Sequence, residues 1–596
     1  MATSSNATPR RRPAAYWRLP EPANKTSADL ATALSVEPLV ATILVGRGLP
    51  DVDAARRFLH PKLDQLHDPL LMRDMGGAVS RLERAISENS PVLICGDYDV
   101  DGASSTAVLK KCIELLGGTA DFHIPHRLKE GYGMRSEVVD WAAANGFGLI
   151  VSVDTGIRAH EVVRHANASG IDVVVTDHHL AEAEVPAAHA VLNPNRPGCD
   201  YPNKHLCGAG VVFKLVQALL TRSDMAEARR NALLDSFLKP VAIATVADIV
   251  PLTGENRVIV KRGLSGLRRV RNAGLKALLT VAGFEDGECP SAHQVAFRLA
   301  PRMNAAGRMA SARDVVELFL TDQADRAREL AEQLDALNRD RQRVEAEIVR
   351  AILHECETRP PEQDCAALVF AGENWHLGVL GIVASRLVEQ FGRPVFVLSD
   401  AAAGSEADRH LSGSGRSIPA FHLLEALESM PELFTKFGGH RQAAGLSLQA
   451  RQLEEFQRRF GAFASSRLTS EDFRPRHEAD AQARLSDLSE RCVEQILSLG
   501  PFGFGNPSPN LFVTGVELAE PPRTIGTANK HFTLRLRQNG RTLSCKAWNF
   551  GSRVAELPVG AKLDVLLQIE DDPYSKRRGY ASWCLLLKDF REAERA

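Results

Sequence analysis

The sequence lacks paired cysteines and long apolar runs. Its 10 cysteines are scattered without a C-x-x-C pair, which argues against a zinc ribbon and against a disulfide framework. No apolar stretch is long enough to span a membrane, and none near the amino terminus resembles a secretory signal. We therefore expect a protein of the reducing cytoplasm with no membrane partner.

Charge of one sign is not in excess either. The chain has 72 Lys and Arg against 74 Asp and Glu, a net charge of −2, which argues against a protein that coats nucleic acid indiscriminately. A local basic groove is still compatible with this balance, because binding depends on how charge is distributed. The Gly-x-x-x-x-Gly-Lys-Ser/Thr loop of ATP-driven motors is also absent, and Gly413–Arg416 is not a full dinucleotide-binding fingerprint.

What is present is a long chain of ordinary globular composition, with 596 residues, 44% hydrophobic and 24% charged. Because single cores rarely reach that size, we expect three or four domains. Composition and periodicity predict five segments. The first two are a disordered N-terminal tail over 1–35, which contains Arg10–Arg12, and an α/β domain with a helical lead-in over 36–322. They are followed by a connecting helix over 323–358, a smaller α/β domain over 359–468 and a β-barrel domain over 469–596.

The periodicity of apolar residues supports this division. From about 70 to 320, β-prone runs alternate with amphipathic helices, one of them over Ser104–Leu116, as in a doubly wound α/β domain. Residues 323–357 read as one charged helix without Gly or Pro that joins two lobes, with a coiled coil as the alternative. Short alternating strands typical of a small barrel are Phe532–Leu536, Leu543–Ala547 and Leu563–Leu567.

Acidic motifs follow three apolar runs in the first half of the chain. Val92–Cys95 leads into Gly96–Gly102, Leu149–Val153 into Asp154–Gly156, and Val173–Thr176 into Asp177–His179, while a fourth motif is Ala247-Asp248. Parallel strands end in polar loops, and open parallel sheets gather those loops at one edge. Several carboxylates and one or two imidazoles should therefore meet in a small volume, where carboxylates either take up protons or hold a cation.

These residue types predict a metal site. A mostly oxygen shell with one imidazole favours Mn²⁺ or Mg²⁺ over structural Zn²⁺, and two such ions would activate a water and stabilise the oxygen that leaves phosphorus. The residues expected to form the site are Asp97, Asp99, Asp154, Asp248 and either His178 or His179. Asp101 reads as a helix cap or turn residue, and Asp177 with one histidine as groups that orient the ligands.

The motifs resemble the DHH phosphoesterase superfamily and, more narrowly, the RecJ family of bacterial single-strand-specific exonucleases. The narrower resemblance runs from about residue 36 nearly to the end, and its motifs are Pro125–Gly133, Gly208–Lys214, Ala247–Leu252, Pro301–Arg308, Trp375–Arg386, Ser412–Ser417, Gly438–His440 and Pro501–Pro507. It implies a doubly wound DHH domain, joined by the long helix to a smaller α/β DHH-associated domain, and then an OB-type domain that binds single strands.

The resemblance also implies an activity. We expect a monomeric two-metal 5′→3′ exonuclease that degrades single-stranded DNA to 5′-mononucleotides in recombination and repair, together with a helicase and single-stranded-DNA-binding protein. The implied Mn²⁺ or Mg²⁺ ligands are Asp97, Asp99, Asp154, His178 and Asp248, and His179 is counted with them as catalytic. One position departs from the family pattern. Cys95 stands where some relatives have histidine, and its thiol either softens the site or packs in the strand.

Further residues are expected to contact DNA. Arg127 and Arg302 are candidates for holding a terminal 5′-phosphate, with a structural salt bridge as the alternative. Other expected contacts in the two lobes are Arg308, His376, Ser414, Arg416 and His440. In the terminal domain, the interleaved aromatic and basic side chains are Lys530, His531, Phe532, Lys546, Trp548, Tyr574 and Lys576–Arg578. The alternative for the aromatic ones is a place in the barrel core.

Two other functions fit parts of the pattern. A DHH phosphodiesterase for short oligonucleotides, cyclic dinucleotides or pyrophosphate would share both lobes without needing the terminal domain. A non-catalytic single-stranded-DNA-binding scaffold would be expected to have lost metal ligands, whereas every acidic position is intact here. The exonuclease is therefore the favoured interpretation.

Overall fold

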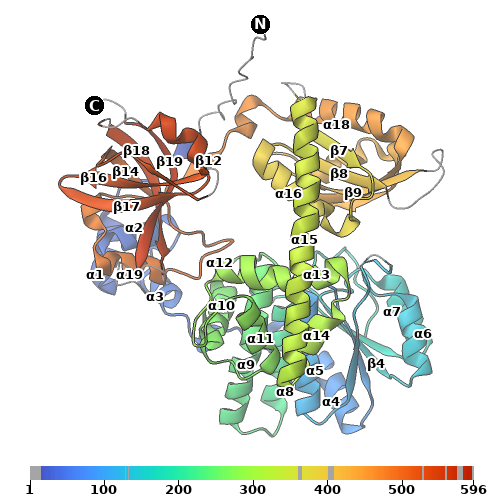
Figure 1. The fold of residues 1–596 in the computed structure, drawn as a ribbon. Coiled ribbons are helices and arrows are strands. Elements are labelled where there is room, and N and C mark those ends of the chain that lie inside the picture. The colour runs from blue at the N-terminus through green and yellow to red at the C-terminus, as the bar shows by residue number, and fades with distance from the viewer. Residues whose placement is uncertain are drawn as a thin grey trace. The chain divides into compact units, whose positions relative to one another are not determined.

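The computed structural model describes residues 15–593 except 128, 132, 360–364, 401–408, 527–528, 558–559, 561 and 573–581 (Figure 1). Arg10–Arg12, Tyr574 and Lys576–Arg578, which were singled out in the sequence, lie outside the described residues. The chain divides into two compact units. The larger contains residues 17–307, 311–334 and 478–596, and the smaller contains 15–16, 308–310 and 335–477.

A parallel five-stranded sheet forms the centre of the first lobe, in the larger unit. Its strand order is β3 (Ala120–His123), β2 (Val92–Cys95), β4 (Leu149–Val153), β5 (Asp172–Thr176) and β6 (Ala190–Leu192). The three predicted strands are confirmed. Nearly every residue of these strands is buried because helices cover both faces of the sheet, as in a doubly wound fold. The three acidic motifs that follow β2, β4 and β5 therefore start at one edge of the sheet.

Helices surround this sheet. Those described for the lobe are α4 (Met75–Ser87), α5 (Val100–Leu115), α6 (Ser136–Ala144), α7 (His160–Ala168), α8 (Gly208–Arg222), α9 (Glu227–Ala247), α10 (Gly254–Gly266), α11 (Ala273–Val281), α12 (Ala292–Gln294), α13 (Ala300–Met309) and α14 (Arg313–Leu320). The helix predicted over Ser104–Leu116 begins one turn earlier, because the Asp99 carboxylate accepts hydrogen bonds from the amides of Asp101 and Gly102 and so caps α5.

The predicted connecting helix is confirmed as α15 (Ala324–Thr358). Its apolar stripe is interrupted in the middle, where the buried side chains are polar. There the Arg341 guanidinium pairs with Glu345 at 2.7 Å and donates to Asn338 at 2.6 Å. This polar segment compensates its own charges, which a buried ion pair requires.

The smaller unit contains a second α/β fold. Its sheet order is β10 (Phe434–Gly439), β11 (Ala443–Gln449), β9 (His410–Arg416), β8 (Val395–Asp400) and β7 (Leu368–Gly372), of which only β7 and β8 are parallel. The helices α16 (Leu380–Phe391), α17 (Leu423–Glu428) and α18 (Leu453–Arg467) cover it. Phe396, Phe456 and Phe460 pack together in its core with ring centroids 5.2–5.5 Å apart. Phe456 and Phe460 stack on each other, and both meet Phe396 edge-on.

The C-terminal segment folds as a small closed barrel, as predicted. Its described strands are β13 (Ala481–Gln482), β14 (Leu511–Leu518), β15 (Arg523–Ile525), β16 (His531–Gln538), β17 (Arg541–Ala547), β18 (Lys562–Asp571) and β19 (Trp583–Glu592), preceded by α19 (Glu490–Ser498). Pairing of β14 with β16 closes the sheet on itself. The predicted fold class, an α/β lobe, a long helix, a smaller α/β lobe and a barrel, is confirmed.

The predicted N-terminal boundaries are wrong in two respects. The expected tail over 1–35 contains α1 (Lys25–Leu34), which Asn24 caps. The lead-in helices α1, α2 (Pro38–Gly46) and α3 (Val52–Leu59) belong with the barrel, because Leu30, Val40 and Ile43 share one hydrophobic core with its strands. Sequence periodicity shows that a helix has an apolar face but does not show which distant segment covers it.

Among the described residues, no single helix is long and apolar enough to cross a membrane, although the pair α1 and α2, bent by 118°, meets that test of length and composition.

Candidate metal centre

The first acidic loop is held between α5 and α13. Gly102 lies so close to this loop that an added Cβ would be 2.5 Å from the Asp97 amide nitrogen. Gly307 of α13 makes a similar approach, with an added Cβ 2.1 Å from the Tyr98 carbonyl oxygen, and Asn304 Oδ1 accepts a hydrogen bond from Val100. Only glycine fits at these two contacts, so the positions of Asp97 and Asp99 depend on both helices.

The loop after β4 places Asp154 beside the start of α8. Asp154 has a left-handed backbone (φ 61°), which is uncommon for a residue other than glycine, and its side chain is buried. Gly208 at the start of α8 fits against it, because an added Cβ there would be 2.6 Å from the Asp154 Cβ. The backbone at Asp154 is thus in a conformation that the surrounding packing imposes.

Asp177 orients the histidines that follow it. Its Oδ1 accepts hydrogen bonds from the His178 amide (2.7 Å) and from the ring Nδ1 of His179 (2.7 Å), and its Oδ2 accepts one from the Ile157 amide (2.9 Å). Burial opposes ionisation of Asp177, but the hydrogen bond and charge of His179 lower its pKa. Burial likewise opposes protonation of His179, yet Asp177 raises the pKa of that ring to about 9.

His178, the other histidine of the pair, faces the carboxylates. His178 Nε2 lies 3.2 Å from Asp154 Oδ1, 3.7 Å from Asp248 Oδ2 and 3.9 Å from Asp101 Oδ2. Side-chain amides of Asn193 and Asn195 donate to the carbonyls of His179 and His178 and fix the backbone of the pair. The two histidines therefore have different surroundings, with His178 nearly buried and the His179 side chain 43% exposed.

Potential ligand atoms gather in three overlapping groups, each within 4.8 Å. The groups are Asp97, Asp99 and Asp154; Asp101, His178 and Asp248; and Asp154, His178 and His179. The structure thus brings together all six residues that the sequence predicts as catalytic. Asp154 and His178 each belong to two groups, so the arrangement fits two neighbouring cations.

The electrostatics of the cluster favour a cation. Burial, followed by the charge of Asp99, raises the pKa of Asp97 to about 8, and burial with Asp101 and Asp99 raises that of Asp248 to about 9. Within the described part of the chain, the buried atoms Asp97 Oδ1, Asp248 Oδ2 and His178 Nε2 have no hydrogen-bond partner. Buried oxygens and a nitrogen without partners fit divalent cations, which would offset both the burial and the mutual repulsion.

Asp101 is part of this cluster and does not cap α5, so that interpretation of the sequence was wrong. Its side chain is 1% exposed, and its two oxygens accept hydrogen bonds from the amides of Gly208 (2.6 Å) and Ala209 (2.7 Å) at the start of α8. A helix N-terminus stabilises a carboxylate in this way. Two signals in the sequence pointed to this role, the third acid of the Gly96–Gly102 motif and the small residues Gly208–Gly210.

Cys95 packs in the strand and is not a ligand. Its side chain faces the core formed with α6 and α7, beside Leu93 and Val139. Burial raises the pKa of the thiol to about 12, which disfavours the thiolate. Of the two interpretations of this departure from the family pattern, packing is the one that the structure supports.

The expected DNA contacts of the larger unit have mixed outcomes. Arg127 lies over the Tyr98 ring at 4.9 Å, and its charge acts on Asp97, so it is next to the cluster. Arg302 donates to the Arg298 carbonyl at 2.6 Å. In the barrel, Phe532 is 0% exposed, so the prediction that it stacks on bases is wrong. It points inward with Leu534 and Leu536, as the alternation of β16 requires.

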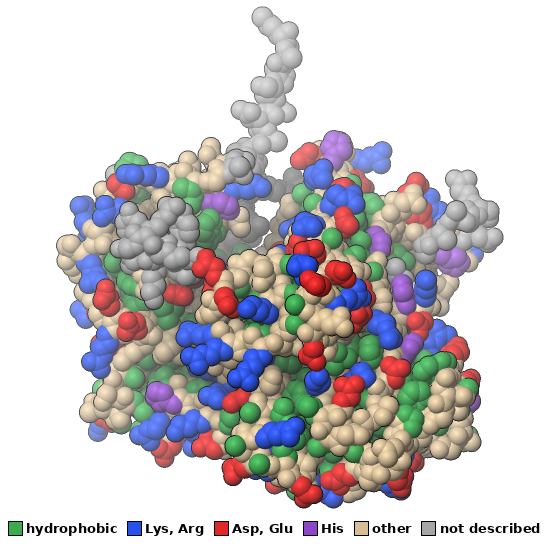
Figure 2. Space-filling view, turned by 60° about the horizontal axis from the view of Figure 1, so that its bottom comes forward, with side chains coloured by type: hydrophobic (Ala, Val, Ile, Leu, Met, Phe, Trp, Pro, Cys, Tyr) green, Lys and Arg blue, Asp and Glu red, His purple; other side chains and the backbone are tan. Residues whose placement is uncertain are grey.

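Trp548 and Lys530 are exposed on the barrel, and the Trp548 ring meets His531 edge-on at 5.0 Å. Lys546 differs, because its ammonium is paired with Asp572 at 2.7 Å. The face drawn in Figure 2 has Lys and Arg side chains interspersed with Asp and Glu.

In the smaller unit, three expected contacts converge near the start of α16. Arg308 donates to the Gly378 carbonyl at 3.1 Å, His376 Nδ1 accepts from the Gly378 amide at 3.2 Å, and an added Cβ at Gly381 would be 2.8 Å from Arg416. Ser414 pairs with Gly445 on the neighbouring strand, and the His440 amide donates to Ala443. Arginine and a helix start are groups that hold phosphate.

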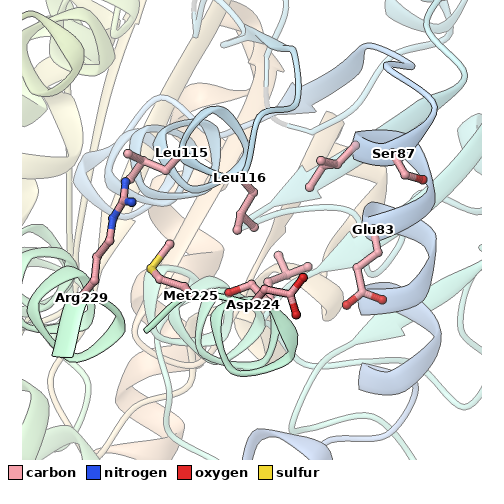
Figure 3. A pocket seen from close by; sticks show the side chains of 10 residues that line it. Glu83, Ser87, Leu115, Leu116, Asp224, Met225 and Arg229 are labelled. Carbon is pink, nitrogen blue, oxygen red and sulfur yellow. The ribbon is translucent and has the colours of Figure 1, made fainter. Parts of the chain in front are cut away.

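A surface cavity of about 430 Å³ lies elsewhere in the first lobe. It is lined by the last turns of α4, α5 and α8 and by the start of α9, including Glu83, Leu116 and Arg229 (Figure 3). None of the predicted site residues lines it, and Glu83 is already paired with Arg222 at 2.8 Å. We therefore place the functional site at the cluster of carboxylates and histidines at the strand ends, and not at this cavity.

Three known families of domain match the sequence. The N-terminal domain of the DHH family matches residues 91–245, the DHHA1 domain matches 363–466, and the RecJ OB domain matches 479–582. The first match covers the parallel sheet and the metal cluster except Asp248, the second covers the smaller α/β fold, and the third covers most of the barrel.

Curated relatives match over most of their own length. Single-stranded-DNA-specific exonuclease RecJ of Bacillus subtilis is 37% identical over 94% of this chain and 69% of its own. The proteins of the same name from Dickeya dadantii and Escherichia coli are each 37% identical, over 96% and 94% of their own lengths. Among solved structures, that of RecJ in complex with Mn²⁺ from Thermus thermophilus has a TM-score of 0.81 at 28% identity, covering 97% of this chain and 80% of that one.

Proposed function

The chain belongs to the RecJ family of single-stranded-DNA-specific exonucleases, and on that premise we propose that it hydrolyses single-stranded DNA from the 5′ end, at a two-metal centre in the first lobe. The observation that supports this most is the buried cluster of carboxylates and a histidine, in which Asp97 Oδ1, Asp248 Oδ2 and His178 Nε2 have no hydrogen-bond partner among the described residues. An Asp-rich shell with one imidazole suits Mn²⁺ or Mg²⁺.

We assign the ions to the residues predicted from the sequence. Asp97, Asp99, Asp154, His178 and Asp248 would hold them, and when bound they supply a nucleophilic water and neutralise the departing oxygen. Asp101 fixes the start of α8 against the cluster, and Asp177 keeps the His179 ring in one orientation. We assign contact with the substrate to His179, because it is the more exposed of the pair.

An exonuclease that cleaves from the 5′ end must recognise that end, and we assign this role to Arg127. Its guanidinium lies close to the metal cluster, and arginine is the side chain best suited to a terminal phosphate. Replacing Arg127 by alanine should raise the KM for 5′-phosphorylated strands about 10- to 100-fold, the size of one charge-assisted contact of about 1.5–3 kcal/mol, and leave 5′-hydroxyl strands unaffected. Steady-state rates on the two substrates test this. Equal losses on both would contradict the assignment.

The remaining expectations concern the cellular setting. We propose that the enzyme acts in recombination and repair, in the cytoplasm, as a monomer, with a helicase and single-stranded-DNA-binding protein as partners. These follow from the family resemblance alone. In binding single-stranded DNA, the exposed Trp548 of the barrel would stack on a base and the exposed Lys530 would contact a phosphate.

A time course on end-labelled DNA with Mn²⁺ tests the function directly. The substrates are 5′-phosphorylated single strands, 5′-blocked single strands and blunt duplex, each with and without EDTA. We expect mononucleotides from the 5′ end of the single strand only, and none with EDTA. Cleavage of dinucleotides or cyclic dinucleotides alone would assign the chain to the small-substrate phosphodiesterases, and binding without cleavage would assign it to the scaffolds.

A further inference from the structure

Asp248 lies in a turn with a strained backbone conformation. Helix α9 ends at Ala247, Asp248 is its C-cap, and the next residue, Ile249, has a left-handed backbone with φ 57°. Glycine or asparagine normally occupies that position, because a β-branched side chain clashes with the backbone there. Ile249 is 69% exposed, so its own burial offsets little of this strain. Contacts farther along the chain must therefore maintain the turn.

Those contacts come from a loop of the barrel domain, Gly500–Pro507. The Leu252 amide, three residues after Ile249, donates to the Phe504 carbonyl at 2.8 Å. An added Cβ at Gly505 would be 2.8 Å from the Pro251 Cβ, and one at Gly503 would be 2.7 Å from the Leu252 side chain. The loop backbone therefore lies directly against Pro251 and Leu252, with no room for any side chain between them.

The loop is itself fixed at both ends. The Gly500 carbonyl accepts hydrogen bonds from Arg257 (3.0 Å) and Lys261 (3.0 Å), both on α10. At the other end, the Asn506 side chain donates to the carbonyls of Leu499 (3.0 Å) and Pro501 (2.8 Å) and closes the loop on itself. A loop held in this way can support a neighbouring turn, because these hydrogen bonds already restrict its own conformation.

We propose that the Gly500–Pro507 loop is a positioning element of the metal centre. By holding Pro251 and Leu252, it keeps Ile249 in its strained conformation and so fixes the Asp248 carboxylate, whose Oδ2 lies 3.7 Å from His178. This inference rests on the proposed role of Asp248 as a ligand. The proposal gives the barrel domain a second role besides binding single strands. It also explains the glycines of the Pro501–Pro507 motif, because the loop backbone lies directly against Pro251 and Leu252.

Two glycine substitutions in the barrel domain make a matched test. Gly505 (φ 73°) and Gly515 (φ 66°) both have left-handed backbones, but an added Cβ at Gly515 meets nothing within 4 Å. Gly505→Ala should therefore weaken Mn²⁺ binding by the whole protein without DNA about 10- to 100-fold, the usual effect of losing an outer support of a ligand. Gly515→Ala should change it less than about twofold. Equal Mn²⁺ affinities in the two variants would overturn the proposal.

A rescue variant separates positioning from general damage. If the loop acts by maintaining the strained turn, Ile249→Gly should restore most of the Mn²⁺ affinity in the Gly505→Ala background, because glycine adopts that backbone unaided. Additive losses in the double variant would contradict the proposal. The turnover of a short oligonucleotide should follow the metal affinity, with KM unchanged. A wild-type protein that binds Mn²⁺ but cleaves no DNA would instead contradict the proposed function and leave the positioning test intact.

Discussion

Replacing Asp99 by asparagine should lower the cleavage rate at least about 10³-fold. The substitution removes one carboxylate from a cluster in which bound cations contribute several kcal/mol to transition-state stabilisation, and each 1.36 kcal/mol is a tenfold change in rate. Fold and DNA binding should persist, because asparagine caps helices as well as aspartate does and would preserve the start of α5. Single-turnover rates with Mn²⁺, and binding of single strands in EDTA, measure the two effects separately.

Asp51 provides the matched control. It caps α3 through a hydrogen bond from the Ala54 amide at 2.8 Å and is not in the metal cluster. Asp51→Asn should therefore leave both the rate and the binding unchanged. If Asp99→Asn retained cleavage within tenfold of the wild type, the assignment of Asp99 as a ligand would be wrong, and the centre would have to be built on the remaining carboxylates.

The metal cluster could be predicted from sequence because its signals are local. Each acidic motif directly follows a run of apolar residues, such as Leu149–Val153, that is buried on both faces of a parallel sheet. Once the runs are identified as parallel strands, the topology of the sheet brings their ends together without further information. Asp97, Asp154 and His178 are far apart in the sequence, yet their proximity needed only this rule.

Other features depend on contacts between distant segments, which periodicity does not reveal. Asp101 looks like a cap until the amides of Gly208 and Ala209 are seen to meet it. The lead-in helices have apolar faces, but only the fold shows that the barrel covers them. Phe532 is different, since the signal was available. Its alternation with Leu534 and Leu536 already indicated the inner face of a strand.

The buried Lys214–Glu255 pair should be the site of the largest loss of stability. Both side chains are 0% exposed and lie 3.0 Å apart, and Glu255 also accepts hydrogen bonds from the Tyr201 hydroxyl and the His67 amide. Burial lowers the pKa of Lys214 although Glu255 opposes this. Glu255→Ala would leave Lys214 buried and uncompensated, which costs about 3–5 kcal/mol. The melting temperature of the first lobe should fall by roughly 6–20 °C.

A triple variant tests whether the charges or the volume matter. Tyr201→Phe, Lys214→Met and Glu255→Leu together replace the network by apolar groups of similar size, which is often close to neutral. The triple variant should therefore melt nearer to the wild type than Glu255→Ala does, in the same thermal scan. A lower melting temperature for the triple variant than for Glu255→Ala would mean that the hydrogen bonds of the network, and not the uncompensated lysine, dominate the loss of stability.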